Sequence, residues 1–296
     1  SERGRRKEAK VAKLKLQLPE RQYDKNPNRV LRIGFVSGDL GLHPVTNFLE
    51  PVWNSINLDC FSLYVYATST LNDEATQRLK EKTAAWHFVR DKSDVDLAKL
   101  IGEDKIDILF DLSGHTAYNR LPMFALKPAP IQISWIGYPG TTGLQAMDYF
   151  MNINHAPQPE IFDHQFIEKI LYVPFTQQFQ VITDSPAVGK LPALDNGYFT
   201  FASFNRPKKI NDQVLTAWSK ILIALPTSKM IIGALSGQQV IDNIRNKMVS
   251  MGVLAEQLIF RERTNITGYL AMHNEIDLLL DTFPYTGGTT TNYALW

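Results

Sequence analysis

Residues 31–44 read LRIGFVSGDLGLHP, a short apolar run that passes directly into a loop with two glycines, an aspartate and a histidine. The run contains β-branched side chains and is four to eight residues long, which is typical of a buried strand. Residues 106–112, IDILFDL, have the same character. Between these strands we expect helices over 72–82 and 93–101, the second capped by Ser93.

The same alternation of strand and helix continues along the chain and decides the fold class. Further strands are expected at 61–66, 131–136, 149–153, 170–173, 198–204, 229–234, 257–261 and 276–281, with helices at 212–225, 238–251 and 267–273. Such alternation predicts βαβ units and mostly parallel sheets, hence an α/β protein with two units in series. The expected segments are a basic leader or linker (1–28), a first lobe (29–175), a connector (176–197) and a second lobe (198–296).

Composition argues against several classes of protein. The 296 residues include 31 basic and 30 acidic side chains, and a net charge of +1 gives no general reason to expect nucleic-acid binding. Residues 1–16 carry a local charge of +5, which we interpret as a solvated leader. Cys60 is the single cysteine, so no intrachain disulfide or cysteine zinc site is expected. We expect a cytoplasmic protein without a transmembrane segment, since no run approaches 18 apolar residues.

Polar residues follow several strands of the first lobe at the point where each strand ends. Asp39 and His43 follow the first strand, and His115 follows the strand at 106–112. An imidazole or carboxylate there could act as a general base, or the loop could be a turn whose aspartate caps the next helix. The loop GYPGTTG begins at Gly137, whose amide could donate to a sugar or phosphate oxygen or could simply form a tight turn.

Two further segments lie in the second lobe. Residues 204–210, FNRPKKI, place three cations after a strand, and a lysine there could neutralise a phosphate or be part of a solvated turn. Residues 281–296, DTFPYTGGTTTNYALW, run from a strand through a Gly-Gly turn into a helical start. Backbone amides and the positive end of a helix dipole make such a turn suitable for binding phosphate, although a capped surface helix is the alternative.

Other well-known patterns are absent from the sequence. The loop at 37–44 does not have the G-x-G-x-x-G spacing, and the turn at 287–288 lacks the G-K-[ST] of a P-loop. The six histidines show no tight metal spacing, and no G-x-S-x-G elbow occurs. Asp94-Val-Asp96 opens an expected helix and is interpreted as capping. No metal or other cofactor is therefore expected.

Several of these phrases, in this order, resemble the catalytic region of the protein O-GlcNAc transferase and SPINDLY-like family, glycosyltransferase family 41, in its bacterial form. The most specific are Gly38-Asp-Leu-Gly-Leu-His-Pro, Lys127-Pro-Ala-Pro-Ile-Gln with Gly137-Tyr-Pro-Gly-Thr-Thr-Gly, and Asp281-Thr-Phe-Pro-Tyr-Thr-Gly-Gly-Thr-Thr-Thr. The resemblance runs from about residue 31 to residue 296. It implies two Rossmann-like units of the glycosyltransferase B type. It also implies metal-independent transfer of N-acetylglucosamine from UDP-GlcNAc to Ser or Thr of proteins, with inversion.

The resemblance also implies roles for particular residues. His43 or Asp39 would be the base, and Lys209 would contact the diphosphate. The residues expected to bind substrate are Gly137, Asn205, Arg206, Gly287, Gly288, Thr289 and Thr290. The expected partners are a nucleotide sugar, a protein acceptor and tetratricopeptide repeats upstream in the parent protein.

Three alternatives stay open at this point. The donor could be GDP-fucose, or the product could be glucose on asparagine, because the phosphate-binding parts would be similar for each. Family members continue beyond residue 296, so the second lobe is expected to be incomplete. The chain could therefore also be a truncated, non-catalytic binding fragment.

Overall fold

The computed structural model describes residues 24, 26–153, 163–173, 178–181 and 185–296. The chain divides into two compact units, residues 1–182 and 183–296. Most of the expected leader (1–28) and part of the expected connector (176–197) lie outside the described residues. Among the described residues, no helix has both the length and the apolar character needed to cross a membrane.

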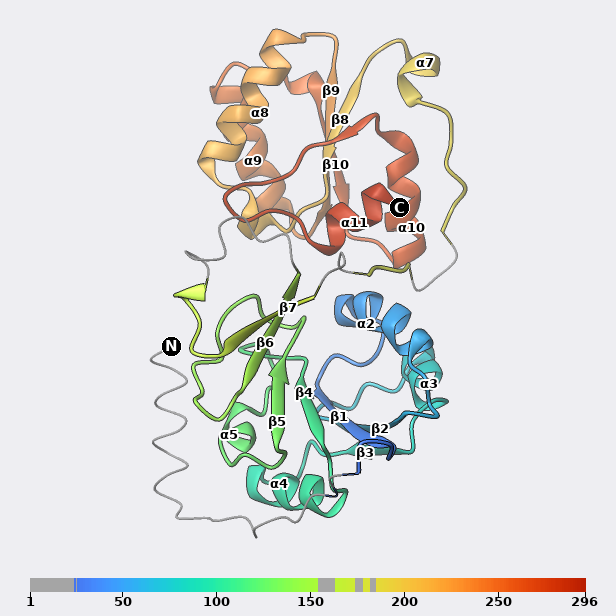
Figure 1. Ribbon diagram of the computed structural model, residues 1–296. Helices are drawn as coiled ribbons and strands as arrows, with labels where there is room; N and C mark the ends of the chain where they lie inside the picture. Colours follow the sequence, from blue (N-terminus) through green and yellow to red (C-terminus); the bar gives the residue numbers. More distant parts are fainter. Residues whose placement is uncertain (1–23, 25, 154–162, 174–177, 182–184) are drawn as a thin grey trace. The chain divides into compact units, whose positions relative to one another are not determined.

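A parallel sheet forms the centre of the first unit (Figure 1), with strand order β3-β2-β1-β4-β5-β6-β7. Its strands are β1 (Leu31–Ser37), β2 (Phe61–Ala67), β3 (Ala85–Phe88), β4 (Ile108–Asp111), β5 (Ile131–Ser134), β6 (Tyr149–Ile153) and β7 (Lys169–Val173). Each pairs in parallel with its neighbour, as β1 does with β2 and β4. Strands such as β1 are apolar because a parallel sheet is covered on both faces.

Helices cover both faces of this sheet, and each face has its own apolar core. The helices are α2 (Pro44–Ser55), α3 (Glu74–Lys80), α4 (Asp94–Glu103) and α5 (Leu121–Phe124). Leu49 and Trp53 of α2 join one core, together with Ile33 and Phe35 of β1. Val36 of β1 joins the other core, on the side of α4 and α5. Successive strand residues point to opposite faces, so the two cores lie on opposite sides of the sheet.

The strand order places one crevice in the first unit. The chain moves outward from β1 to β2 and β3, then returns to the other side of β1 as β4. Loops leaving β1 and β4 therefore diverge to opposite faces at the carboxyl edge of the sheet. Ligands of doubly wound folds bind at such a switch point. The loop 38–43 follows β1, and the loop 112–120 follows β4.

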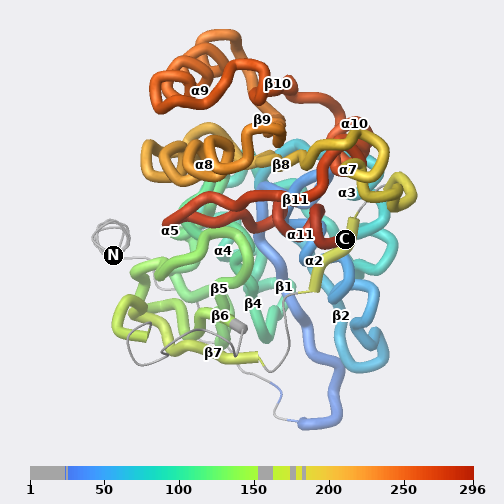
Figure 2. The backbone as a smooth tube through the Cα atoms, turned by 90° about the horizontal axis from the view of Figure 1, so that it is seen from above, coloured from blue at the N-terminus to red at the C-terminus, as the bar shows by residue number. Residues whose placement is uncertain are grey.

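The second unit repeats this plan with a smaller sheet of order β10-β9-β8-β11. Its strands are β8 (Thr200–Ser203), β9 (Lys229–Leu235), β10 (Leu258–Glu262) and β11 (Leu278–Leu279), and its helices are α7 (Pro192–Asn196), α8 (Asp212–Ala224), α9 (Gln238–Ser250), α10 (Ile266–Ala271) and α11 (Thr289–Leu295). Figure 2 shows α8 and α9 side by side, and both pack on one face of the sheet around Trp218. Its switch point lies between β8 and β11, so the loops at 204–209 and 280–288 meet there.

The structure confirms the α/β class and differs from the sequence prediction in local places. Edge strand β3 was not predicted, because its residues AWHF are only partly buried and show no apolar run. The strand expected at 276–281 pairs through only Leu278 and Leu279. α7 lies inside the segment that we expected to be a connector without structure. Ser93 caps α4 as predicted, with its side chain accepting from the Asp96 amide, and Asp94 and Asp96 lie in the first turn of that helix.

Candidate active site

The loop between β1 and α2 holds both predicted acid–base residues. Ser37 Oγ accepts a hydrogen bond from the Asp39 amide at 3.0 Å, and Thr46 Oγ1 donates to the Asp39 carbonyl at 3.4 Å. From α3, Asp73 Oδ2 accepts from the Leu42 amide at 2.8 Å. These contacts fix the loop at the switch point of the first sheet.

His43 is the N-cap of α2, so the cap is not the aspartate that the alternative interpretation of this loop required. Its backbone is extended (φ −141°, ψ 150°), and its Nδ1 accepts a hydrogen bond from the Val45 amide at 3.3 Å. Because Nδ1 is the acceptor, the neutral ring carries its proton on Nε2, an assignment made from the hydrogen-bond network. Nε2 lies 3.8 Å from Asp39 Oδ1.

The environment of the Asp39 carboxylate changes its basicity. Burial raises the pKa of Asp39, and the neighbouring His43 lowers it by less, so the net shift is upward. A general base works best when its pKa approaches the working pH. Protonated His43 would stabilise the ionised carboxylate, and neutral His43 would direct an N–H toward it.

Gly137 is required by a close approach of two loops. A Cβ at this position would lie 2.3 Å from the Leu112 carbonyl oxygen, a backbone atom that cannot move aside. The Gly137 amide donates to the Trp135 carbonyl at 2.9 Å, closing a γ-turn around Ile136, whose φ is +67°. The amide is therefore engaged in a tight turn, which is the other alternative that the sequence left open.

His115 joins the loops that follow β4 and β5. Its Nε2 lies 3.1 Å from the Thr141 carbonyl, and its ring meets Tyr138 edge-on, with centroids 5.3 Å apart. Asp111, fully buried at the end of β4, accepts from the Ser113 and Gly114 amides. These contacts hold the two loops against each other beside the switch point.

Lys209 lies where the second sheet changes strand order. Its Nζ donates to the Thr286 carbonyl at 2.6 Å and lies 4.1 Å from the centroid of the Tyr285 ring. Burial lowers the pKa of Lys209, the Asp281 carboxylate raises it and Arg206 lowers it, with a net downward shift. The predicted cation and the predicted glycine turn therefore share one site within the second unit. An ammonium has three donors, so this one can bind further acceptors.

Asp281 organises this turn from the end of β11. Its Oδ1 accepts from the Thr282 amide at 2.7 Å, from the Gly287 amide at 2.7 Å and from Asn205 Nδ2 at 3.0 Å. Thr291 Oγ1 donates to Oδ2 at 3.3 Å. The Gly287 amide is therefore not open to a phosphate, contrary to the prediction. Instead, it fixes the path of the chain into α11.

The other predicted residues of the second unit surround this turn. Arg206 is exposed beside Lys209, and Asn205 is fully buried. Gly288 precedes α11 and has open space where a Cβ would stand. Thr289 begins the helix, while Thr290 hydrogen bonds to Tyr269. Burial raises the pKa of Tyr269 to about 12, so its hydroxyl stays protonated at neutral pH.

Sequence reasoning missed the carboxylates that hold these loops. Asp73 holds the loop of Asp39 and His43, and Asp281 holds the glycine turn. Glu168, 4% exposed, accepts from the Thr142 amide at 2.7 Å and from Thr141 Oγ1 at 2.6 Å. Asp281 could have been found, since it ends the strand expected at 276–281 and precedes a turn rich in donors. The other two act over long separations that the sequence does not reveal.

The residues described by the structure offer no group of three or more His, Cys, Asp or Glu side chains that could hold a metal ion. Cys60 is exposed. The candidate residues thus form two separate clusters, one in each unit and each at the switch point of its own sheet. One contains Asp39 and His43, and the other contains Asn205, Lys209 and Asp281.

Comparison with known proteins places this geometry in a family. The model described as Glycosyl transferase family 41 matches residues 9–188. A protein of Arabidopsis thaliana named probable UDP-N-acetylglucosamine–peptide N-acetylglucosaminyltransferase SPINDLY is 34% identical over 92% of this chain and 30% of its own length. The protein of that name from rice, Oryza sativa subsp. japonica, is 35% identical over 91% of this chain and 30% of its own. The chain thus spans about 30% of the length of these curated relatives.

Solved structures agree with this placement. A mutant O-GlcNAc transferase of Thermobaculum terrenum superimposes with a TM-score of 0.85 at 35% identity, covering 94% of this chain and 53% of that one. Anabaena Alr3699/HepE, solved in complex with UDP, has a TM-score of 0.53 at 12% identity, over 90% of this chain and 78% of its own, which supports the shared fold alone. The match to the family model extends over more than half of the chain, and the fold is that of the glycosyltransferase B type. The chain belongs to glycosyl transferase family 41.

Proposed function

We propose that this protein is the catalytic region of a protein glycosyltransferase. It transfers a sugar from a nucleotide diphosphate sugar to the hydroxyl of Ser or Thr, with UDP-GlcNAc as the donor. The names of the relatives support this donor, since they are called UDP-N-acetylglucosamine–peptide N-acetylglucosaminyltransferases. The single observation that carries the proposal is the Lys209 ammonium held at the glycine turn, 2.6 Å from the Thr286 carbonyl.

The chemistry of inverting transfer assigns a task to each cluster. The acceptor oxygen attacks the anomeric carbon, its proton goes to a base, and the bond to the diphosphate breaks. Asp39 takes the proton, because burial raises the pKa of its carboxyl group and so makes the carboxylate a stronger base. His43 orients and stabilises that carboxylate through Nε2. Inversion follows from attack on the face opposite the departing phosphate.

Charge develops on the leaving diphosphate, and a fixed cation must compensate for it. Lys209 supplies this charge from a position defined by Thr286 and by the Tyr285 ring. Gly288 and Thr289 lie at the start of α11, where backbone N–H groups favour an anion. We therefore propose that transfer requires no metal and no cofactor besides the donor, so added EDTA should leave the rate unchanged.

Lys209→Ala tests the proposal, with Lys208→Ala as its matched control. Both lysines lie in the same 3₁₀ turn (Pro207–Lys209), but Lys208 is exposed and has no hydrogen bond or ion pair recorded among the described residues. Binding of UDP-GlcNAc, UDP and GDP-fucose is measured by calorimetry, and transfer to a serine peptide by mass spectrometry. Lys209→Ala should abolish transfer and weaken donor binding, while Lys208→Ala retains both.

Three results would contradict this function. Equal turnover in both variants would remove Lys209 from the site. Binding of GDP-fucose without binding of UDP-GlcNAc would replace the proposed donor, and modification of asparagine would replace the proposed acceptor. Tetratricopeptide repeats upstream in the parent protein remain part of the proposal. A parent sequence that lacks them before this region would contradict that part.

A further inference from the structure

A cavity lies in the first unit, beside the loop of Asp39. It has a volume of about 490 Å³ and is lined by Thr68, Arg90, Asp94, Tyr118, Asn119, Arg120 and Pro122. Thr68 directly follows β2, Arg90 lies two residues beyond β3, and Tyr118 belongs to the loop after β4. The cavity is therefore at the carboxyl edge of the sheet, the edge that carries ligand sites in doubly wound folds.

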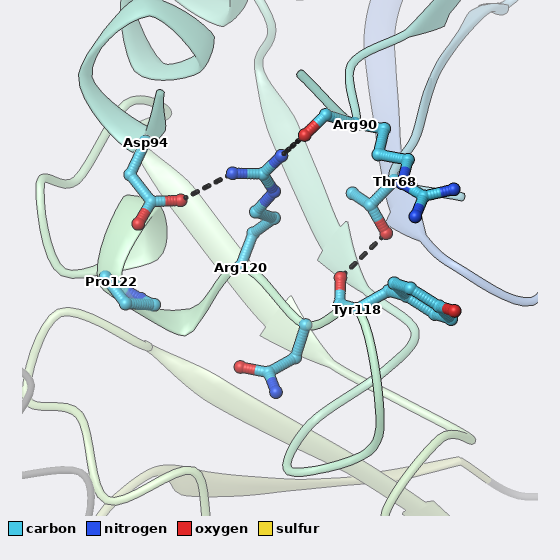
Figure 3. Close-up of a pocket in the computed structure, with 7 residues that line it drawn as sticks. Thr68, Arg90, Asp94, Tyr118, Arg120 and Pro122 are labelled. Atoms are coloured by element: carbon cyan, nitrogen blue, oxygen red, sulfur yellow. Dashed lines mark hydrogen bonds and ion pairs between the residues drawn. The ribbon is translucent and has the colours of Figure 1, made fainter. Parts of the chain in front are cut away.

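Arg120 lines this cavity and holds the backbone of a neighbouring loop. Its guanidinium donates to the carbonyls of Lys92, Val89 and Arg90, at 3.0, 2.8 and 2.8 Å. It also pairs with the Asp94 carboxylate at 3.2 Å (Figure 3). The charges of Arg120 and Asp94 therefore compensate each other. The loop between β3 and α4 is held in place by this partly buried side chain.

Arg90 is the cation of this cavity that the pairing of Arg120 with Asp94 leaves available to a ligand. Its side chain is exposed, and its guanidinium lies 5.8 Å from the centroid of the Tyr118 ring. Among the described residues, no carboxylate pairs with it within 4.0 Å. Arg90 therefore carries the net positive charge of the cavity and can form a bidentate pair with a carboxylate.

Tyr118 is held in a strained conformation that keeps its ring at the surface. Its φ is +58°, which a bulky residue rarely adopts, and the residue is 53% exposed. Thr68 Oγ1 fixes the strained backbone by donating to the Tyr118 carbonyl at 2.7 Å. Backbone strain of this kind collects at functional sites, because the surrounding structure must maintain it.

The cavity and the acid–base loop share a wall. A Cβ on Gly38 would lie 2.7 Å from Tyr118 Cβ and 3.3 Å from Thr68 Oγ1, so the loop packs directly on two residues that line the cavity. Ser69 Oγ donates to the Gly38 carbonyl at 2.6 Å. Asp39 is the next residue along the chain. A peptide with its hydroxyl at Asp39 would place neighbouring side chains near this cavity.

We propose that this cavity is an acceptor subsite that binds an acidic side chain close to the modified hydroxyl. The proposal rests on the function proposed above. Arg90 pairs with the carboxylate of the peptide, and the Tyr118 ring packs against the aliphatic carbons of that acidic side chain. The hydroxyl of the same peptide then lies at Asp39, next to Gly38. The protein would then select Ser or Thr in acidic sequence surroundings.

Direct binding tests the subsite independently of turnover. The probes are fluorescent peptides with one serine. A single glutamate is placed in turn at each of the three positions before and after the serine, and each peptide has a counterpart with glutamine at the same position. Anisotropy gives the Kd for the unmodified protein, for Arg90→Ala and for Lys92→Ala. Lys92 is the matched control, an exposed cation two residues away that does not line the cavity.

We expect one glutamate position to bind about threefold to tenfold more tightly than its glutamine counterpart, a preference that Arg90→Ala removes and Lys92→Ala keeps. Arg90→Glu should reverse the preference toward a lysine at the same position. Equal binding of both peptides by the unmodified protein would overturn the proposal, and so would equal losses in the two alanine variants. If the charge preference is present but no sugar is transferred, the proposed function fails while the anion site stands.

Discussion

Asp281→Asn separates the charge of this residue from its shape. Asparagine can keep its carbonyl oxygen at the place of Oδ1, where Thr282, Gly287 and Asn205 donate. The amide group then faces Thr291 Oγ1, which can accept a hydrogen bond as well as donate one. The variant therefore preserves the geometry and replaces charge-assisted hydrogen bonds with neutral ones.

The expected loss follows from those three contacts to Oδ1. A hydrogen bond to a charged group contributes about 1 kcal/mol more than a neutral one. Three such bonds set an upper limit of about 3 kcal/mol, and solvent screening and non-additivity reduce it, so we expect about 1–3 kcal/mol. A local opening that is easier by this amount speeds amide exchange by about fivefold to 150-fold.

Hydrogen exchange read by mass spectrometry on the peptide 281–295 measures this local stability directly. Asp242→Asn is the control, because Asp242 makes an exposed ion pair with Arg245 at 3.4 Å on α9. We expect faster exchange at the turn and weaker UDP binding in Asp281→Asn, with neither change in the control. Unchanged exchange and unchanged UDP affinity in Asp281→Asn would refute the argument that this carboxylate holds the turn.

The same variant has a defined pH dependence. Burial raises the pKa of Asp281, but hydrogen bonds from Thr282, Gly287, Asn205 and Thr291 outweigh it and lower the pKa below its ordinary value. The resulting stability is present above the unfolded pKa of about 4 and is lost as the pH falls through the folded pKa. The difference between the protein and Asp281→Asn should therefore shrink in acid. A constant difference from pH 7 to pH 2 would contradict this cause.

Three further predictions concern other residues. Gly137→Ala should lower the free energy of unfolding by about 1–3 kcal/mol in urea denaturation, because its Cβ would meet the Leu112 carbonyl at 2.3 Å; equal stability would mean that the two loops can separate. Asp39→Asn should abolish the acid limb of the pH–rate profile, because burial raises the pKa of this carboxyl group and that group would titrate in the limb; a retained limb would assign the base to another group. Burial raises the pKa of Asp107, but the Arg29 guanidinium, 2.5 Å away, and the Arg32 amide together lower it, so this pair stabilises the protein at neutral pH and less in acid. Arg29→Met should therefore lower the free energy of unfolding at pH 7 and by less at pH 3. A difference from the unmodified protein that is the same at pH 7 and at pH 3 would argue against this pair.

Local signals explain which elements the sequence could predict. The strand at residue 31 has an apolar run, and the helices near residues 93 and 212 each begin at a capping side chain. The structure places all three within a few residues of the prediction. Strand β3 lacks an apolar run because it lies at the edge of the sheet, where one side of the strand faces solvent. The start of α2 was obscured because histidine, an uncommon cap, occupies the N-cap position.

The candidate site divides in the same way. Asp39 with His43 and Lys209 with the glycine turn could be chosen from the sequence, since each polar group follows a strand and carries the required chemistry. The engaged amides of Gly137 and Gly287 could not be chosen, because their partners depend on how the chain turns back on itself.

The amino-acid sequence by itself determined the α/β class and the repetition of the unit, and it supplied the candidate reactive side chains, because hydrophobic period, capping and side-chain chemistry depend on neighbouring residues. Tertiary structure alone decided the order of strands, and with it the switch points between β1 and β4 and between β8 and β11. Strand pairing joins residues far apart in the chain, such as Ile33 with Ile108. Its free energy therefore depends on the packing of the whole sheet rather than on any local pattern.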